Sequence, residues 1–310
     1  MTIVVAGGTG LAGSAIVRAY QATGAEVIAL NRSVVDLLDR DATTSFIKKV
    51  KPSLVVDAAA KVGGIGANNA FPVEFLSDNV RIQSNLMEAA HAADVEKFIF
   101  LGSSCIYPRD CAQPIKEEYL LTGPLEETNS AYAIAKIAGI ELIKSFRKEY
   151  GRTWISLMPT NLYGPNDNFE LQGSHVLPAF IRRFVEAAQN KVATETLWGT
   201  GSPKREFLHV DDLAAAVVHL GSTYDSPLHL NIGTGEDLTI KALAELVAEL
   251  AGFEGEIAWD STKPDGTPRK VLDVTKVKSL GWAPKISLRD GIASTIAWYK
   301  DASAKGVARR

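Results

Sequence analysis

The sequence has few cysteines, no excess of basic residues and no long apolar run. Only Cys105 and Cys111 occur in 310 residues, which excludes a disulfide framework and predicts a reducing, cytoplasmic location. The 33 Lys and Arg residues are balanced by 36 Asp and Glu residues, which argues against nucleic-acid binding. No segment is apolar enough to span a bilayer, and the N-terminus lacks the basic region of a signal peptide, so we expect no membrane association.

Short apolar runs do occur, and they alternate with helical patterns. The alternation predicts right-handed βαβ units around a buried parallel sheet. The expected fold is α/β, a Rossmann-type doubly wound sheet whose ligands bind beyond the carboxyl ends of the strands. The predicted strands cover residues 3–6, 26–30, 54–58, 97–101, 154–158 and 229–232.

The pattern changes near residue 165, where a polar stretch begins. We expect residues 1–165 to form a dinucleotide-binding domain to which residues 207–235 return. Residues 166–206 and 236–310 are then a smaller substrate-binding domain, with helices near 177–190 and 240–251. The small and basic tail, 302–310, is expected to fray.

A glycine-rich turn follows the first predicted strand and opens a helix. There, Gly10 lets the backbone approach a pyrophosphate and Gly13 lets helix and strand pack closely. The helix N-terminus offers N–H groups and a positive dipole end to the phosphates. A turn without a ligand is the alternative. The predicted dinucleotide contacts are Gly7, Gly8, Thr9, Gly10, Leu11, Ala12 and Gly13.

The end of the second predicted strand bears on the choice of dinucleotide. NAD enzymes usually carry an acid there, which accepts hydrogen bonds from the ribose hydroxyls. This chain has Asn31 and Arg32 instead, and a guanidinium can pair with a 2′-phosphate. A solvated surface arginine is the alternative. Asp36 and Leu37 would suit the edge and face of the adenine, so the predicted cofactor is NADP(H).

A tyrosine and a lysine stand one helical turn apart, at Tyr132 and Lys136. Free tyrosine titrates near pH 10, and a nearby ammonium is expected to lower the pKa of the phenol so that it can act as an acid. Ser103 follows the fourth predicted strand and can bond the same substrate oxygen. The alternative role for Ser103 and Ser104 is to satisfy loop backbone groups.

These motifs together resemble the extended short-chain dehydrogenases. Longer strings resemble one branch of them, the GDP-L-fucose synthase family, through nearly the whole chain. The strings are residues 58–65, 101–108, 131–139, 159–165, 205–212 and 263–270. Thr9 departs from members of the family that carry a basic residue in the glycine turn, which leaves Arg32 to select NADP(H).

The resemblance implies inversion of C3 and C5 of GDP-4-dehydro-6-deoxy-D-mannose, followed by NADPH-dependent reduction of the C4 ketone. It implies that Cys105 is the base and His175 the acid of the inversion, and that Tyr132 protonates the C4 oxygen. Further implied cofactor contacts are Leu101, Gly102, Ser103, Ser104, Lys136, Pro159, Thr160, Asn161, Leu162 and His175. The implied contacts to the GDP-sugar are Arg183, Trp198, Arg205 and Asp265.

Two other functions remain open. A 4-epimerase or 4,6-dehydratase of the same fold would keep NAD(H) bound, but such enzymes tend to carry an acid at the second strand's end. A regulator that only binds dinucleotide should have lost Tyr132 or Lys136, and both are present. No residue grouping has metal-ligand spacing, so no metal is predicted. The resemblance implies a homodimer, and Cys111 receives no role.

Overall fold

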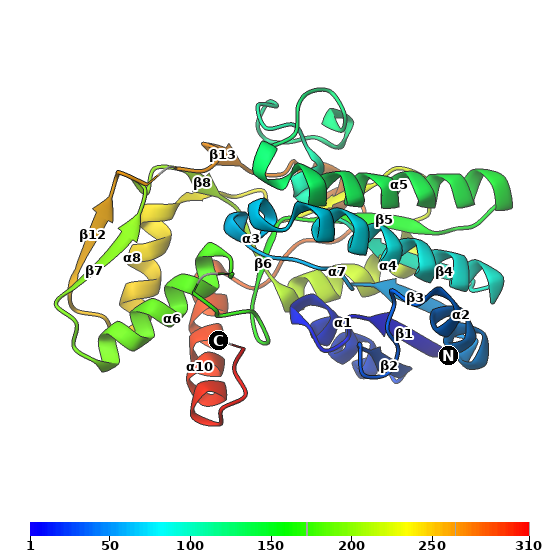
Figure 1. Cartoon of the computed structure of the whole chain (residues 1–310), viewed down its shortest axis with the longest axis horizontal. Coiled ribbons are helices and arrows are strands. Elements are labelled where there is room, and N and C mark those ends of the chain that lie inside the picture. Colours follow the sequence, from blue (N-terminus) through cyan, green and yellow to red (C-terminus); the bar gives the residue numbers. More distant parts are fainter. Residues whose placement is uncertain (172, 264, 310) are drawn as a thin grey trace.

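The computed structural model describes residues 1–171, 173–263 and 265–309 (Figure 1). Four of the predicted segments include residues outside the described part: 166–206 (Gln172), 236–310 (Pro264 and Arg310), 263–270 (Pro264) and 302–310 (Arg310). None of the described helices has the length and apolarity needed to cross a membrane.

Six parallel strands form the main sheet, in the order β10-β5-β4-β3-β1-β2. This is the doubly wound order that the alternating pattern predicts, because the chain starts inside the sheet and extends it in both directions. All six predicted strands are confirmed, with ends that differ by about one residue. They are β1 Thr2–Ala6, β2 Glu26–Leu30, β3 Leu54–Asp57, β4 Lys97–Leu101, β5 Ile155–Pro159 and β10 Leu230–Ile232.

Helices cover both faces of this sheet (Figure 1). On one face, α4 (Pro72–Ala92) packs against α5 (Ser130–Tyr150) and against α2 (Arg40–Val50). On the other face, α1 (Leu11–Ala22) packs against α7 (Val210–Thr223). The strands are buried on both sides, which explains why they read as continuous apolar runs in the sequence.

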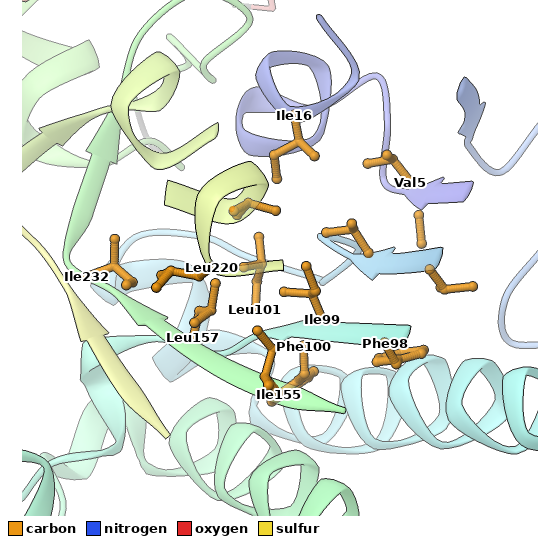
Figure 2. Close-up of a cluster of buried hydrophobic side chains, with 14 of the residues drawn as sticks. Val5, Ile16, Phe98, Ile99, Phe100, Leu101, Ile155, Leu157, Leu220 and Ile232 are labelled. Carbon is orange, nitrogen blue, oxygen red and sulfur yellow. The ribbon is translucent and has the colours of Figure 1, made fainter. Parts of the chain in front are cut away.

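Successive side chains of β4 point to opposite faces of the sheet. Figure 2 shows Ile99 and Leu101 on the side of α7, and Phe98 and Phe100 on the side of the α4 and α5 helices. All four are at most 5% exposed. The alternation matters for function, because it decides which side chains at the strand end can reach α5.

A second apolar cluster lies outside the main sheet, around α6 (Val176–Gln189), α8 (Ile240–Ala251) and α10 (Leu288–Ala304). The predicted helices near 177–190 and 240–251 are confirmed. In α8, Leu243, Val247 and Ala251 follow each other at helical spacing and are buried in this cluster. The Thr239 hydroxyl caps the start of α8, and Gly252 ends it in a left-handed conformation.

Short strands form three small sheets outside the main sheet. The pairs are β6 (Asn161–Tyr163) with β9 (Phe207–His209), and β7 (Thr194–Trp198) with β12 (Glu256–Asp260). A third small sheet joins β8 (Lys204–Arg205) to β11 (Leu238–Thr239) and β13 (Arg269–Lys270). The remaining elements are α3 (Ile65–Ala70), α9 (Thr275–Ser279) and 3₁₀ turns η1 (Ser104–Ile106), η2 (Glu117–Tyr119) and η3 (Glu127–Asn129).

The prediction that the C-terminal tail frays is wrong for its described residues. Ala302 lies in α10 and is 3% exposed. The Arg309 carbonyl accepts a hydrogen bond of 2.8 Å from the Phe169 amide, and Arg309 bridges Asn168. Composition alone suggested a loose end, but the backbone of the tail hydrogen-bonds the loop that contains Asn168 and Phe169.

Candidate active site

A cleft of about 2300 Å³ runs from the carboxyl ends of the main strands into the second cluster. Its size is sufficient for a dinucleotide and a nucleotide sugar together. Most of the predicted site residues line it, from both parts of the chain. These are Gly7, Thr9, Gly10, Leu11, Ala12, Arg32, Asp36, Leu37, Gly102, Ser103, Ser104, Cys105, Tyr132, Pro159, Thr160, Asn161, Leu162, His175, Arg183, Trp198, Arg205 and Asp265.

Four predicted residues are buried behind the cleft wall instead: Gly8, Gly13, Leu101 and Lys136. The Gly8 amide donates to the Leu30 carbonyl at 3.0 Å and so joins the turn to β2. Lys136 is 3% exposed and lies behind Tyr132, which lines the cleft. These residues therefore shape the site from beneath its surface.

The glycine turn has the form that a phosphate-binding turn requires. Gly7 has a φ of +72°, and a Cβ there would lie 2.7 Å from the Ala58 carbonyl oxygen. Gly10 is extended and precedes the first turn of α1, whose N-terminal N–H groups have no side-chain cap. The turn and the helix end thus leave amide donors directed at the cleft.

At the end of β2, Arg32 is the cation that borders the cleft. Its side chain is 77% exposed, and its Nε lies 3.9 Å from Asp36 Oδ1. This contact is long and solvated, so it leaves the guanidinium available to a ligand. Leu37 is 9% exposed and packs into the main apolar cluster, so little of its side chain borders the cleft.

Tyr132 and Lys136 lie together on α5, as the spacing predicts. The Lys136 Nζ is 5.8 Å from the centre of the Tyr132 ring and donates to the Leu101 carbonyl at 2.9 Å. However, the expectation that the phenol beside Lys136 has a lowered pKa is wrong in this structure. Burial, reinforced by the nearby Cys105 and Asp57, raises the pKa of Tyr132 well above its ordinary value.

Ser103 is extended and precedes η1, so its hydroxyl sits at the carboxyl end of β4. Its Oγ accepts a hydrogen bond of 3.2 Å from the Cys105 amide. The Ser103 hydroxyl also hydrogen-bonds the Cys105 side chain. Both roles considered for Ser103 are therefore compatible in one geometry: it satisfies a loop amide and faces the cleft.

The Cys105 thiol lies in the cleft wall, and Lys270 is its charged neighbour. The two side chains meet at 3.5 Å between Nζ and Sγ. Burial alone would raise the pKa of the thiol, but the Lys270 charge and hydrogen bonds from Ser103, Asn129 and Lys270 outweigh it. The pKa of Cys105 therefore lies below its ordinary value, which favours a thiolate.

His175 precedes the first turn of α6 and faces the same cleft. His175 is an exposed residue that solvent reaches from the cleft. Partial desolvation by the cleft walls, together with the Lys270 charge, lowers the pKa of His175. Lys270 thus acts on both residues predicted to exchange protons, and it favours a thiolate on one and a more acidic imidazolium on the other.

The predicted substrate residues are held by protein partners around the far part of the cleft. Arg183 donates to Glu195 Oε1 and to the Thr196 carbonyl, both at 2.5 Å, which leaves only part of its guanidinium for a ligand. Trp198 is 73% exposed, with Lys263 Nζ 5.7 Å from its ring centre.

Arg205 and Asp265 belong to the same part of the cleft. Arg205 donates at 2.5 Å to the Thr267 carbonyl, and Asp265 accepts from the amide and hydroxyl of Thr200 at 3.0 and 2.7 Å. Both contacts therefore also hold the loop that contains Asp265 and Thr267. No group of three possible metal-ligating side chains occurs in the described ranges.

Lys270 and Asn129 are the site residues to which sequence reasoning gave no role. Asn129 precedes α5 and bonds the thiol, and Lys270 is brought to it by the parallel pairing of β13 with β8. Lys270 is 165 positions from Cys105 in the chain. In the sequence, Lys270 was marked only by its place in segment 263–270, which resembles the GDP-L-fucose synthase family.

Comparison with known proteins agrees with this geometry. Residues 3–233 match the model of the NAD dependent epimerase/dehydratase family, and the chain belongs to this family. Within it, the chain is 54% identical to GDP-L-fucose synthase 1 of Arabidopsis thaliana, over 96% of this chain and 92% of that protein. It is 49% identical to GDP-L-fucose synthase of Escherichia coli (strain K12), over 96% of both chains.

A solved structure shows the same arrangement. The GDP-L-fucose synthetase of Naegleria fowleri bound to NADP superimposes with a TM-score of 0.91 at 29% identity, over 100% of this chain and 96% of that one. The resemblance to the GDP-L-fucose synthase branch is thereby confirmed.

Proposed function

We propose that this protein is an NADP(H)-dependent epimerase and reductase that converts GDP-4-dehydro-6-deoxy-D-mannose to GDP-L-fucose. The observation that carries the proposal is the convergence of Tyr132, Cys105 and His175 on one cleft, in a chain about half identical to GDP-L-fucose synthases over nearly its full length. A reductase alone would need Tyr132 but not the thiol and the imidazole.

The inversion uses the acidity of hydrogens next to the C4 ketone. The Cys105 thiolate removes a proton from C3 or C5, the C–H electrons form an enolate, and the negative charge moves to the C4 oxygen. Tyr132 and Ser103 donate hydrogen bonds to that oxygen. His175 returns a proton to the same carbon from the opposite face, which inverts it. The Lys270 charge supports both transfers.

The reduction that follows needs a hydride on C4 and a proton on its oxygen. NADPH supplies the hydride when it is bound. Tyr132 supplies the proton: its O–H bond breaks as the O–H bond of the new alcohol forms, and the phenolate is stabilised by the Lys136 ammonium. Ser103 holds the oxygen in place, so the same hydroxyl pair serves both halves of the reaction.

The residues present fit a bound NADP(H). The turn at Gly7 has no room for a side chain, and the uncapped start of α1 offers amide donors to a diphosphate. Arg32 would hold the 2′-phosphate beside Asp36, and Asn161 would border the nicotinamide at the end of β5. We assign the cofactor to residues 1–165 and 207–235, and the GDP-sugar mainly to 166–206 and 236–310.

We also propose that the protein is a cytoplasmic homodimer. Helices α4 and α5 leave apolar side chains exposed away from the sheet: Val73 is 75% exposed, Leu76 36% and Ile134 48%. Packing these faces against a second copy would bury them. The cytoplasm is the fitting location, because a base such as Cys105 must stay a free thiol.

The test is NADPH oxidation by the purified protein with a panel of GDP- and UDP-linked 4-ketosugars. We expect stoichiometric NADPH consumption with GDP-4-dehydro-6-deoxy-D-mannose, and GDP-L-fucose as the product by NMR. The Tyr132→Phe variant is the matched control, and it should fold normally but reduce slowly. A reduced product that keeps the original configuration at C3 and C5 would refute the epimerase half of the proposal.

A further inference from the structure

Asp57 is a buried carboxyl group that neither half of the proposed reaction uses. It ends β3 and is 0% exposed. Its Oδ1 accepts a hydrogen bond of 3.1 Å from the Ala59 amide, and its Oδ2 has no hydrogen-bond partner among the described residues. Burying a carboxylate with an unpaired oxygen is costly, so a compensating charge is expected nearby.

The register of the sheet indicates that the compensating charge is the Lys136 ammonium. Asp57 is in register with Phe100 on the neighbouring strand, and in-register side chains point to the same face. Phe100 points toward the helices that include α5 (Figure 2), and the Lys136 Nζ lies 4.8 Å from its ring centre. Adjacent strands are only about 4.8 Å apart. The Asp57 carboxyl and the Lys136 ammonium therefore lie near each other on the same face of the sheet.

Electrostatics agree with this placement. Burial raises the pKa of Asp57 to about 6, and the Lys136 charge opposes that rise. Burial likewise lowers the pKa of Lys136, and the Asp57 charge opposes the fall. The other titratable groups of this cluster are Tyr132, whose pKa the Asp57 charge raises, and Cys105, which also raises the pKa of Tyr132 from η1.

We propose that Asp57 is a positioning residue for the reduction, the counter-ion that keeps Lys136 an ammonium ion beside Tyr132. This inference rests on the proposed function. When Tyr132 gives its proton to the C4 oxygen, the phenolate left behind needs a cation close to it. In a buried site without a counter-ion, the amine would lose its proton as the pH rises and that cation would disappear.

The test compares the pH dependence of reduction in the wild type and in Asp57→Asn, which keeps the shape and removes the charge. We expect the alkaline fall of kcat to move to lower pH by about one unit or more, the scale of one close opposite charge. At pH 6.5 the two proteins should differ little. Unchanged pH profiles would overturn the proposal.

Asp212→Asn is the matched control. Asp212 is also buried, but its carboxylate accepts from the Lys285 and Ile286 amides at 3.0 and 2.9 Å, away from the cleft. This variant should lose stability and leave the pH profile in place. A shift of equal size in Asp212→Asn would show that the effect of Asp57→Asn is a general consequence of weakened packing, which also overturns the proposal.

A second readout does not depend on turnover. NADPH affinity, measured by fluorescence titration, should fall at alkaline pH in both proteins. In Asp57→Asn the fall should begin at a pH that is lower than in the wild type by a few tenths of a unit to about one unit. If NADPH binding shows this shift but the protein turns over no ketosugar, the inference about Asp57 is supported and the proposed function is refuted. Equal pH dependence of binding in both proteins would remove the inference alone.

Thermal unfolding covers the case in which Asp57→Asn does not fold. Lys136→Met leaves the Asp57 carboxylate without its cation and should melt at lower temperature than the wild type. Adding Asp57→Leu removes that carboxylate, so the double variant should melt higher than Lys136→Met alone. A double variant that is no more stable would show that the two side chains do not interact.

Discussion

Lys270 lies against two proton-transferring side chains at once, and this position makes the pH dependence of the inversion predictable. In Lys270→Met the thiol loses the charge that lowers its pKa, so the thiolate should form only at higher pH. At pH 7 we expect exchange of the C3 and C5 hydrogens with deuterated water to slow by roughly tenfold or more, because a smaller fraction of the thiol is ionised.

Raising the pH should restore much of that exchange, because the thiol then ionises without help. NADPH binding should be unaffected, and it serves as the control. Exchange that is slow at every pH would instead mean that Lys270 binds the substrate and does not tune the thiol. Cys105→Ser gives the reference for complete loss of exchange.

Arg32 is the residue on which the cofactor preference depends. Its exposed guanidinium should form a charge-assisted contact to the 2′-phosphate. Such contacts contribute roughly 1.5–3 kcal/mol, and solvent screening puts this one at the lower end of that range. In Arg32→Ala we therefore expect the KM for NADPH to rise about tenfold while the KM for NADH stays near its wild-type value. Added salt should reduce the difference in the wild type. Equal KM values for both cofactors in the wild type would contradict this role.

At the scale of elements, the docked tail makes a prediction that composition did not suggest. A chain that ends at Lys305 loses the Arg309 carbonyl, which leaves the buried Phe169 amide without its acceptor. We expect a loss of roughly 1–2 kcal/mol and a Tm lower by about 2–4 °C. Hydrogen exchange at the Phe169 amide should accelerate as well.

Arg309→Ala is the control for the tail, because it removes the side chain and keeps the carbonyl. Its Tm and the protection of the Phe169 amide should match the wild type. A loss in Arg309→Ala as large as in the truncated chain would assign the effect to the guanidinium and not to the backbone bond.

The elements themselves were largely predictable, and the reason is physical. Strands such as β4 are buried on both faces, so their sequence is apolar throughout and stands out between helical patterns. The glycine turn and the Tyr132–Lys136 pair were found because their spacing is local. Lys270 and Asp57 were missed because their contacts arise from strand pairing between distant segments, which no local pattern records. The phenol's raised pKa was missed because burial is a tertiary property.

At the scale of the whole molecule, the exposed apolar side chains of α4 and α5 predict its assembly. The double variant Val73→Glu, Ile134→Glu would place charges on the proposed contact, so its mass in light scattering should be half that of the wild type. Leu121→Glu is the control: Leu121 is 64% exposed but lies outside both helices, and its mass should not change. A wild-type protein that is already monomeric would refute the dimer.

The pairing of Lys270 with Cys105 also has a consequence for the order in which the protein becomes active. During synthesis Cys105 is added to the chain 165 positions before Lys270. The pairing of β13 with β8 then brings Lys270 to Cys105. Until that pairing forms, the cysteine is an ordinary thiol, since its largest pKa-lowering influence is missing. A growing chain on the ribosome therefore carries no activated nucleophile, and oxidants or electrophiles meet a reactive sulfur only in the finished fold.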